Sequence, residues 1–378
     1  MRCGQSHDPP LRVSGLRVVQ VVATTTGGTG AHVQSLTRLL VEAGADVTVC
    51  APPEVIELFE LDGRGAHVQP LPIGSRPQAR DARTLARLRR TVAAADVVHA
   101  HSLRAGAFTT LVVPRSVALV TTLHNAILET GARRRVLEGL QRLTVRRSDV
   151  VLCVSSDMVE AVEAAGAEEV RRTFISAPRR SASRSREQAR EELGAGERLV
   201  VLAISRLHPQ KDLSTLVRAA ALLRDVDPLP LVAIAGGGPG EQQTQTLIDE
   251  LDAPVELLGE RADVPDLLVA ADVSTLSSRW EGCPLSVQES LRAGVPFVGT
   301  RVGGVPDLVS DAGLLVPADD AVALSIQLRR VLTEPALLAD LRDRALRRSR
   351  TLPSEVDVAA TAVEAYEAAR ASSSRTPA

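Results

Sequence analysis

Two cationic side chains and two carboxylates are spaced so that they could bind a phosphorylated ligand. Arg206 and Lys211 are five residues apart, and Lys211 is the only lysine of the chain. An arginine fork and a compact ammonium beside a helix N-terminus suit a diphosphate. Glu281 and Glu289 lie on either side of Pro284. Proline disfavours helix before it, so we predict Glu281 in a loop and Glu289 in the first helical turn that follows.

Each of these residues also has a structural interpretation. Ser286 and Glu289 have the spacing of a capping box, in which Glu289 would only accept a backbone hydrogen bond. Asp212 could cap the helix that follows Lys211, and Arg206 could lie on an ordinary solvated turn. The residues by themselves leave capping and ligand contact open.

Glycine-rich segments are expected where two strands end. Residues 24–32 contain Gly27, Gly28 and Gly30, and residues 236–240 read Gly-Gly-Gly-Pro-Gly. Glycine lets a backbone approach a ligand closely, and a following helix offers free N–H groups to an anion. The first segment is neither a phosphate-binding Walker loop nor a dinucleotide fingerprint, so a plain tight turn remains an alternative. The glycine run at 236–238 indicates crowding of the backbone.

Histidines follow two further strand ends. His99 alternates inward with Val97, so we interpret it as structural, whereas His101 and His124 stand at the strand ends themselves. No carboxylate at ligand spacing supports a metal role for either. An imidazole there can bond a sugar hydroxyl or assist proton movement, and His124 is the favoured candidate.

The elements that position these residues follow from the apolar pattern. Short Val, Ile and Leu runs alternate with longer segments of helical period, which is typical of a doubly wound α/β fold with parallel sheets. Aromatic residues make up only 2%, so the cores must consist of Ala, Val and Leu. We predict strands near 16–23, 46–50, 96–100, 117–123, 149–154, 172–176, 199–204, 230–235, 254–258, 272–276, 295–299 and 313–316.

Two Rossmann-like domains accommodate these strands, and a breaker-rich stretch at 176–185 reads as the linker between them. The predicted organisation is an N-terminal domain at 15–180, a C-terminal domain at 186–352, a helix within 353–370 and a disordered tail at 371–378. Charge differs between the halves. Residues 1–180 hold 23 arginines and 17 acidic residues, a net +6, whereas residues 181–378 hold 21 basic and 29 acidic residues, a net −8.

Composition also excludes several classes. The four cysteines are widely separated, which disfavours a disulfide framework or a zinc knuckle. The first ten residues are polar, and no apolar stretch reaches about 18 residues. We therefore expect a cytoplasmic protein without a membrane span, and nothing in the sequence indicates a nucleic-acid partner.

In this order along the chain, the glycine segment at 27–28, the Arg206 and Lys211 pair, the 236–240 loop and the Glu281-x7-Glu289 spacing resemble the retaining GT-B glycosyltransferases of family 4. The resemblance covers roughly residues 15–350. It extends to Val97–His101, Thr121–His124 and the Gly303-Gly304-Val305-Pro306 segment.

The resemblance implies two Rossmann-like domains facing a cleft, with the C-terminal helix crossing back to the N-terminal domain. The donor, a nucleotide sugar linked to UDP or GDP, would bind the C-terminal domain, and the acceptor hydroxyl compound would bind mainly the N-terminal one. The implied catalytic residues are Arg206, Lys211, Glu281 and His124. The implied donor-binding residues are Gly28, Gly237, Arg261, Gly282, Cys283, Pro284, Leu285 and Glu289.

The implied reaction is a metal-independent transfer with retention, in cell-envelope glycan, glycolipid or small-glycoside biosynthesis. The cations would stabilise the departing diphosphate, which is where charge develops. The glutamates would bind hydroxyls. Asp225-Val226-Asp227 is formally a DxD motif, but it precedes Pro228 and reads as a turn, so no cofactor or metal is expected.

Two departures from the family pattern leave other functions open. An Asn-Gly turn is usual where this chain has residues 175–180, and a Phe-Gly pair is common where it has Cys283-Pro284. A non-catalytic sugar-nucleotide-binding partner and a sugar-nucleotide epimerase on the same scaffold are the alternatives. The arginine-rich helices near 81–94 and 133–147 could contact an anionic membrane surface, or could be ordinary solvated faces.

Overall fold

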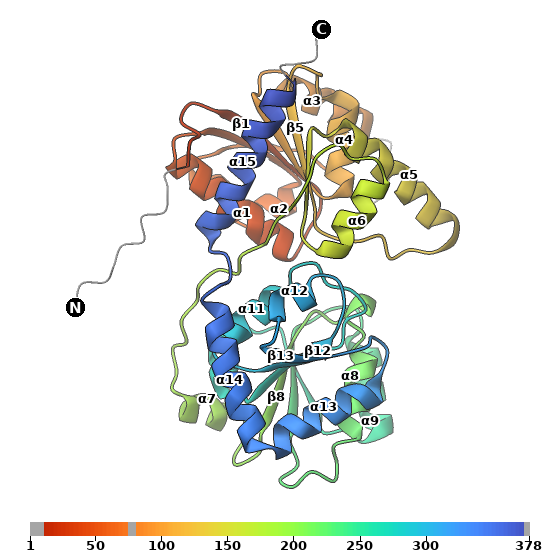
Figure 1. Ribbon diagram of the computed structural model, residues 1–378, viewed down its shortest axis with the longest axis vertical. Coiled ribbons are helices and arrows are strands. Elements are labelled where there is room, and N and C mark those ends of the chain that lie inside the picture. Colours follow the sequence, from red (N-terminus) through yellow and green to blue (C-terminus); the bar gives the residue numbers. More distant parts are fainter. Residues whose placement is uncertain (1–10, 75–80, 374–378) are drawn as a thin grey trace, which may run out of the picture. The chain divides into compact units, whose positions relative to one another are not determined.

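The computed structural model describes residues 11–74 and 81–373, and internal contacts divide the chain into two compact units. The first unit runs to Ser176 and resumes at Pro353, and the second is Ala177–Leu352. Each unit contains a parallel sheet with helices around it (Figure 1). The doubly wound α/β class predicted from the sequence is confirmed.

Within the described part of the first unit, seven strands form a parallel sheet in the order β3-β2-β1-β4-β5-β6-β7. The central strands β4 and β5 are buried on both faces, as expected when helices cover a parallel sheet. The strands are β1 (Arg17–Val22), β2 (Asp46–Ala51), β3 (His67–Pro70), β4 (Val97–His101), β5 (Ala118–Leu123), β6 (Val150–Cys153) and β7 (Val170–Arg172). The helices are α1 (Gly28–Glu42), α2 (Pro53–Leu58), the 3-10 turn η1 (Leu61–Arg64), α3 (Asp81–Val92), α4 (Leu103–Val112), α5 (Gly131–Arg147) and α6 (Ser156–Ala164).

The C-terminal helix α15 (Glu355–Ser373) packs on this first sheet, as the family resemblance implies. Figure 1 draws it in blue against the red to yellow elements of the first unit. Its Ala362 and Tyr366 join a core shared with Val33 and Leu36 of α1. The helix continues to Ser373, three residues beyond the predicted end, and the remainder of the predicted tail, 374–378, lies outside the described residues.

The described second unit has a six-stranded parallel sheet in the order β10-β9-β8-β11-β12-β13. Its strands are β8 (Val200–Ile204), β9 (Leu231–Ala235), β10 (Val255–Gly259), β11 (Val273–Leu276), β12 (Phe297–Thr300) and β13 (Gly313–Val316). Around them lie α7 (Arg186–Glu192), the 3-10 turn η2 (Pro209–Lys211), α8 (Leu213–Ala221), α9 (Glu241–Leu251), α10 (Val264–Ala270), α11 (Leu285–Arg292), α12 (Val305–Val309), α13 (Ala321–Thr333) and α14 (Pro335–Ser349).

Two edge strands of the first sheet differ from the sequence predictions. Strand β3 was not predicted, because its four residues include only one aliphatic side chain, Val68, and remain partly exposed. Strand β7 occupies 170–172 instead of 172–176, since Val170 pairs with Val151 of β6. Edge strands are half-solvated, so their apolar pattern is weak.

Candidate active site

The strongest candidate site lies where β8 and β11 end in the second sheet. These two strands are neighbours, with Leu202 beside Ser274, although six elements separate them along the chain. The chain proceeds from β8 to one side of the sheet and from β11 to the other. Ligands of open α/β sheets bind beyond the carboxyl ends of strands at such a switch point. The loops that leave it contain residues 205–212 and 277–284.

Lys211 and Glu281 meet across these two loops. The Lys211 Nζ lies 2.5 Å from Glu281 Oε1, and the Ser278 hydroxyl donates to the same oxygen at 2.5 Å. The side chains of Lys211 and Glu281 are only 17% and 6% exposed. Because little water reaches these side chains, each charge requires the other as its partner. The lone lysine of the chain is therefore part of a nearly buried ion pair.

Further hydrogen bonds hold the two loops together. The Ser277 hydroxyl donates to the carbonyl oxygens of Lys211 and Asp212, at 3.1 and 2.9 Å. The Gln210 amide donates to the Trp280 carbonyl at 2.8 Å. The Lys211–Glu281 pair is thus fixed through the backbone on both sides, which preorganises it.

Asp212 supports the same turn, but not as the predicted helix cap. It occupies the position before α8 with φ +44°, and its carboxylate makes no capping bond to the helix backbone. It accepts instead from the hydroxyls of Ser214 and Thr215 at 2.6 and 2.7 Å. Burial opposes its ionisation, but these hydrogen bonds outweigh burial and lower the pKa of Asp212.

A glycine pair lies directly behind Glu281. Gly304 N donates to the Glu281 carbonyl at 2.9 Å. A Cβ at Gly303, whose φ is +49°, would lie 1.9 Å from that carbonyl oxygen. Only glycine fits there, so the Gly303-Gly304 segment serves to position Glu281.

The glycine run at 236–240 is crowded by the chain itself. A Cβ at Gly236 would lie 2.0 Å from the Ser205 carbonyl oxygen, and one at Gly238 would lie 2.7 Å from that of Leu207. The Gly237 carbonyl accepts from Leu207 N at 2.8 Å. These glycines therefore support the turn that carries Arg206, whose side chain is exposed.

The capping-box interpretation of Glu289 is wrong. Helix α11 begins at Leu285, immediately after Pro284, so Ser286 lies inside the helix and makes no cap. Glu289 is the fifth residue of α11 and not part of its first turn. Its carboxylate is available for other contacts than a backbone cap.

Burial raises the pKa of Glu289, and the nearby charges of Arg180 and Arg292 partly offset that rise. Arg180 belongs to the segment that departs from the family pattern. Arg292 donates to the Ala177 carbonyl at 2.6 Å, so α11 also anchors the start of this segment. Residues 177–180 thereby contribute positive charge beside Glu289.

The other predicted donor-binding residues have clear structural contacts. Gly282 and Leu285 continue the Glu281 loop into α11, and the Cys283 sulfur accepts from Gln288 Nε2 at 3.3 Å. Arg261 forms two hydrogen bonds to Asp263, at 2.7 and 2.5 Å. A donor-binding role for Arg261 stays a prediction.

In the first unit, Gly28 is the first residue of α1, as predicted for a strand-to-helix turn. Gly27 precedes it without a side-chain cap. A Cβ at Gly30 would lie within 2.1 Å of the Phe59 ring, so that glycine permits helix packing. The segment combines an uncapped helix N-terminus at Gly28 with a packing requirement at Gly30.

His124 directly follows β5 and belongs to a cluster of four buried histidines. Its Nε2 lies 3.5 Å from Nδ1 of His101, and the planes of the two rings are inclined by 25° with centroids 5.7 Å apart. His101 Nε2 lies 3.1 Å from Gln20 Oε1. The His32 ring, on α1, is 5.7 Å from that of His124. The sequence suggested His124, whereas His32 and Gln20 were missed because only the fold brings α1 and β1 to this strand end.

His99 completes the cluster as a structural residue, as predicted. Its two ring nitrogens lie 2.8 Å from the Tyr366 hydroxyl and 2.7 Å from the Thr122 hydroxyl. Burial lowers the pKa of His99 to about 3 and that of His32 to about 4. It also lowers the pKa values of His101 and His124, so all four rings are neutral near pH 7.

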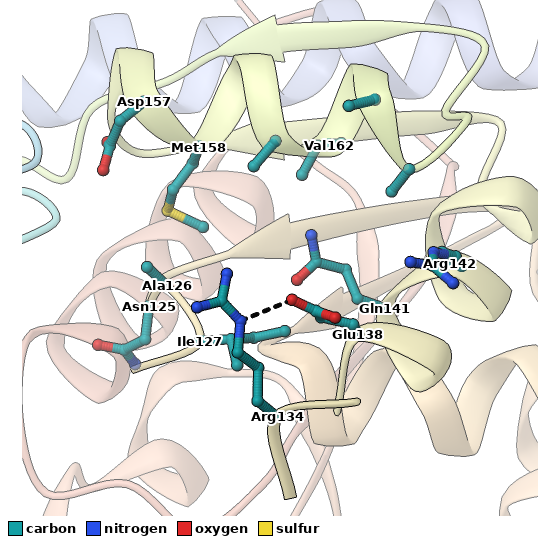
Figure 2. A pocket seen from close by; sticks show the side chains of 13 residues that line it. Asn125, Ala126, Ile127, Arg134, Glu138, Gln141, Arg142, Asp157, Met158 and Val162 are labelled. Carbon is teal, nitrogen blue, oxygen red and sulfur yellow. Dashed lines mark hydrogen bonds and ion pairs between the residues drawn. The ribbon is translucent and has the colours of Figure 1, made fainter. Parts of the chain in front are cut away.

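A cavity of about 280 Å³ opens beside the segment that follows His124, between α5 and α6 (Figure 2). Met158 and Val162 of α6 give it an apolar wall. Arg134, Glu138 and Gln141 of α5 give it a polar one, with Arg134 Nε donating to Glu138 at 2.8 Å. This mixture of walls suits a hydroxylated molecule with one apolar face.

In the part of the chain that the structure describes, no three His, Cys, Asp or Glu side chains are grouped so that they could hold a metal ion. Likewise, none of its helices is long and apolar enough to cross a bilayer.

Ser277 and Ser278 were not predicted as site residues. Their position at the end of β11 was the signal that could have found them.

Comparison with known families matches residues 185–348 to the glycosyl transferases group 1 and residues 27–178 to the glycosyl transferase 4-like domain. A D-inositol 3-phosphate glycosyltransferase from Salinispora arenicola is 30% identical, over 90% of this chain and 88% of its own. The N-acetyl-alpha-D-glucosaminyl L-malate synthase of Bacillus anthracis is 29% identical over 61% of this chain, and the match spans 62% of its length.

The fold is similar to that of HepE from Anabaena, solved in complex with UDP-glucose. The TM-score is 0.77 at 20% identity, covering 92% of this chain and 98% of HepE. The resemblance inferred from the sequence is confirmed by the family matches and by the relatives. This chain belongs to the group 1 glycosyltransferases of family 4, which have the GT-B fold.

Proposed function

We propose that this protein transfers a hexose from a UDP- or GDP-linked donor to an acceptor hydroxyl, with retention of anomeric configuration and without a metal ion. The Lys211–Glu281 pair at the switch point of the second sheet carries the proposal. Family membership and the UDP-glucose complex of HepE support a nucleotide-sugar donor. The product would belong to cell-envelope glycan, glycolipid or small-glycoside biosynthesis.

The cations of the 205–212 loop would do the principal catalytic work. As the bond between the anomeric carbon and the diphosphate oxygen breaks, negative charge accumulates on the diphosphate. Lys211, held by the loop contacts, and Arg206, on the same loop, would stabilise it without reorganising. The amides after Glu281 lead into the N-terminus of α11, which also favours negative charge.

The glutamates would bind hydroxyls. Both hydrogen bonds described for the Glu281 carboxylate end on Oε1, so Oε2 could accept from a hydroxyl of the transferred sugar. Glu289, eight residues further along, would accept from the ribose. Because Lys211 neutralises Glu281, that carboxylate is suited to binding and orientation rather than to attack on the anomeric carbon.

The acceptor would react on the same face from which the diphosphate departs. The new bond joins the acceptor oxygen to the anomeric carbon, the bond to the diphosphate oxygen breaks, and the acceptor proton passes to the leaving phosphate. This accounts for retention without a protein nucleophile. We place the acceptor on the first unit, with the cavity between α5 and α6 as the candidate pocket.

Nucleotide-sugar binding tests the proposal directly. A bound donor stabilises a protein by RT ln(1 + [L]/Kd), about 2.7 kcal/mol at 100 times Kd. We expect one UDP- or GDP-sugar to raise the unfolding midpoint reported by Trp280, the only tryptophan of the chain, which lies beside Glu281 in the second unit.

Turnover with candidate acceptors should then yield the α-product from an α-donor. Replacing Gln141, which lines the candidate acceptor pocket, by leucine should raise only the KM for the acceptor.

The outcomes separate the alternatives. Stabilisation by a nucleotide sugar with no transfer to any acceptor would favour a non-catalytic binding partner. Interconversion of the donor without an acceptor would favour an epimerase. If no UDP-, GDP- or ADP-sugar changes the midpoint, the proposed function is wrong.

We further propose that the enzyme is cytoplasmic and that α5 contacts anionic membranes. Val136 and Leu143, one face of α5, are 70% and 49% exposed, and Leu128 before the helix is 46% exposed. Arg135 and Arg142 lie along one side of this stripe. Apolar side chains flanked by arginine are typical of helices that lie in the membrane interface.

Flotation with phosphatidylserine vesicles tests this contact. The wild-type chain should float at low salt and less at high salt, and Val136→Glu with Leu143→Glu should abolish flotation. A matched control is Val322→Glu with Ile326→Glu, an apolar pair on α13 that is 59% and 49% exposed. Equal flotation of both double variants would contradict the proposal.

A further inference from the structure

A chain of hydrogen bonds leads from α1 through β1 and β4 to His124. Gln20 Nε2 donates to the Thr37 hydroxyl at 2.7 Å, so Gln20 presents Oε1 to His101 Nε2, 3.1 Å away. His101 Nδ1 in turn lies 3.5 Å from His124 Nε2. Thr37, Gln20 and His101 are fully buried, and His124 is 7% exposed. In such a place each polar group is expected to be paired.

The donors and acceptors in this series of hydrogen bonds determine which ring nitrogens carry protons. A carbonyl oxygen only accepts, so His101 must carry its proton on Nε2 to bond Gln20 Oε1. A neutral imidazole has one N–H, and Nδ1 of His101 is therefore an acceptor. The contact between the two rings is then satisfied only if His124 donates through Nε2. The Nδ1 of His124 consequently retains a lone pair.

We propose that Gln20 and His101 are positioning residues that hold neutral His124 in the tautomer protonated at Nε2. Resting on the proposed function, His124 Nδ1 then accepts a hydrogen bond from a substrate hydroxyl. The opposite tautomer would offer that hydroxyl an N–H and would reverse the bond. The small angle of 25° between the two ring planes suits this hydrogen bond between ring nitrogens, and the hydrogen-bond chain fixes which nitrogen of His124 carries no proton.

Nuclear magnetic resonance of the full-length protein with ¹⁵N-labelled histidine tests this assignment without any variant. The chain has seven histidines, and the His124 signals are identified by their loss in His124→Gln. We expect a protonated Nε2 and a bare Nδ1 on both His101 and His124. Protonation of His124 at Nδ1, the result if the Gln20 amide has the reverse orientation, overturns the inference.

Two isosteric substitutions at Gln20 extend the test. Gln20→Met removes the acceptor, so His124 should show a tautomer mixture, and kcat should fall on the order of 10-fold, by analogy with the hydrogen-bond partners of metal-bound imidazoles. Gln20→Glu keeps an acceptor oxygen and should restore both the tautomer and most of kcat. A matched control is Thr122→Val, which removes a bond to His99 in the same cluster and should change neither.

Failure of this inference is distinguishable from failure of the proposed function. An active transferase with His124 protonated at Nδ1 would overturn the inference alone. An inactive chain with the expected tautomer would leave the positioning role of Gln20 and His101 intact, while the proposed hydroxyl contact would fall. Gln20→Met with an unchanged tautomer would show that Gln20 is merely structural.

Discussion

Replacing Lys211 by methionine is expected to lower kcat by about 10²–10³, equivalent to about 2.7–4 kcal/mol of transition-state stabilisation. The substitution preserves the volume of the stem but removes the charge that would meet the departing diphosphate. It also leaves Glu281, 6% exposed and hydrogen-bonded to Ser278, without its ion-pair partner. The donor KM should change less than kcat, because the diphosphate gains its charge during the reaction.

Arg329→Met is the matched control, since it removes a cation of the same unit that pairs with Asp225 at the surface. It should leave kcat unchanged, as exposed pairs contribute little. Because removing one member of a buried pair also destabilises the fold, Trp280 fluorescence must first show that the Lys211→Met protein is folded. A folded Lys211→Met protein with wild-type kcat would exclude the catalytic role of Lys211.

Acid is expected to unfold the first unit selectively. Above about pH 6.5 a histidine is neutral in both folded and unfolded chains and contributes no pH dependence. Below that pH the unfolded chain binds a proton, whereas His32, with a pKa lowered to about 4 by burial, does not. Unfolding is therefore favoured as the pH falls from about 6.5 to about 4, and the loss then levels off.

The loss from His32 alone amounts to about 2 kcal/mol near pH 5. His99, with a pKa lowered to about 3, adds to it, and so do His101 and His124. The total is less than additive because the rings are in contact. Urea unfolding at pH 7 and pH 5 measures the effect through Tyr366, the only tyrosine, whose hydroxyl lies 2.8 Å from His99.

The second unit provides an internal control. Its one histidine, His208, is exposed, and Trp280 reports on its unfolding. We expect the Trp280 midpoint to change much less than the Tyr366 midpoint between the two pH values. A first unit that unfolds at the same urea concentration at pH 7 and pH 5 would show that the histidine cluster does not control acid stability.

The sequence predicts the central strands well because they are buried on both faces. Runs such as Val97-Val98 and Val200-Val201-Leu202 are typical of strands in a covered parallel sheet. The edge strand β3 was not predicted, because it is partly solvated and Val68 is its only aliphatic residue.

Some features of the site could likewise be predicted from the sequence, and others could not. Lys211 and Glu281 each follow a predicted strand, and ligands of such sheets bind beyond the carboxyl ends of strands, so the sequence could indicate both residues. The glycine run indicates that the backbone at Gly236 is crowded. The sequence could not identify the Ser205 carbonyl as the crowding group, because every residue has the same backbone atoms. Similarly, Ser286 has capping-box spacing, and only the actual start of α11 at Leu285 shows that it does not cap.

The chain contains 43 arginines for its one lysine, and that lysine faces Glu281. An aldehyde-bearing analogue of a nucleotide, or any acylating reagent, consequently finds a single side-chain amine to modify in the entire molecule. Covalent labelling of Lys211 followed by mass spectrometry would report occupancy of the proposed donor site as one mass increment, with the α-amino group as the competing amine.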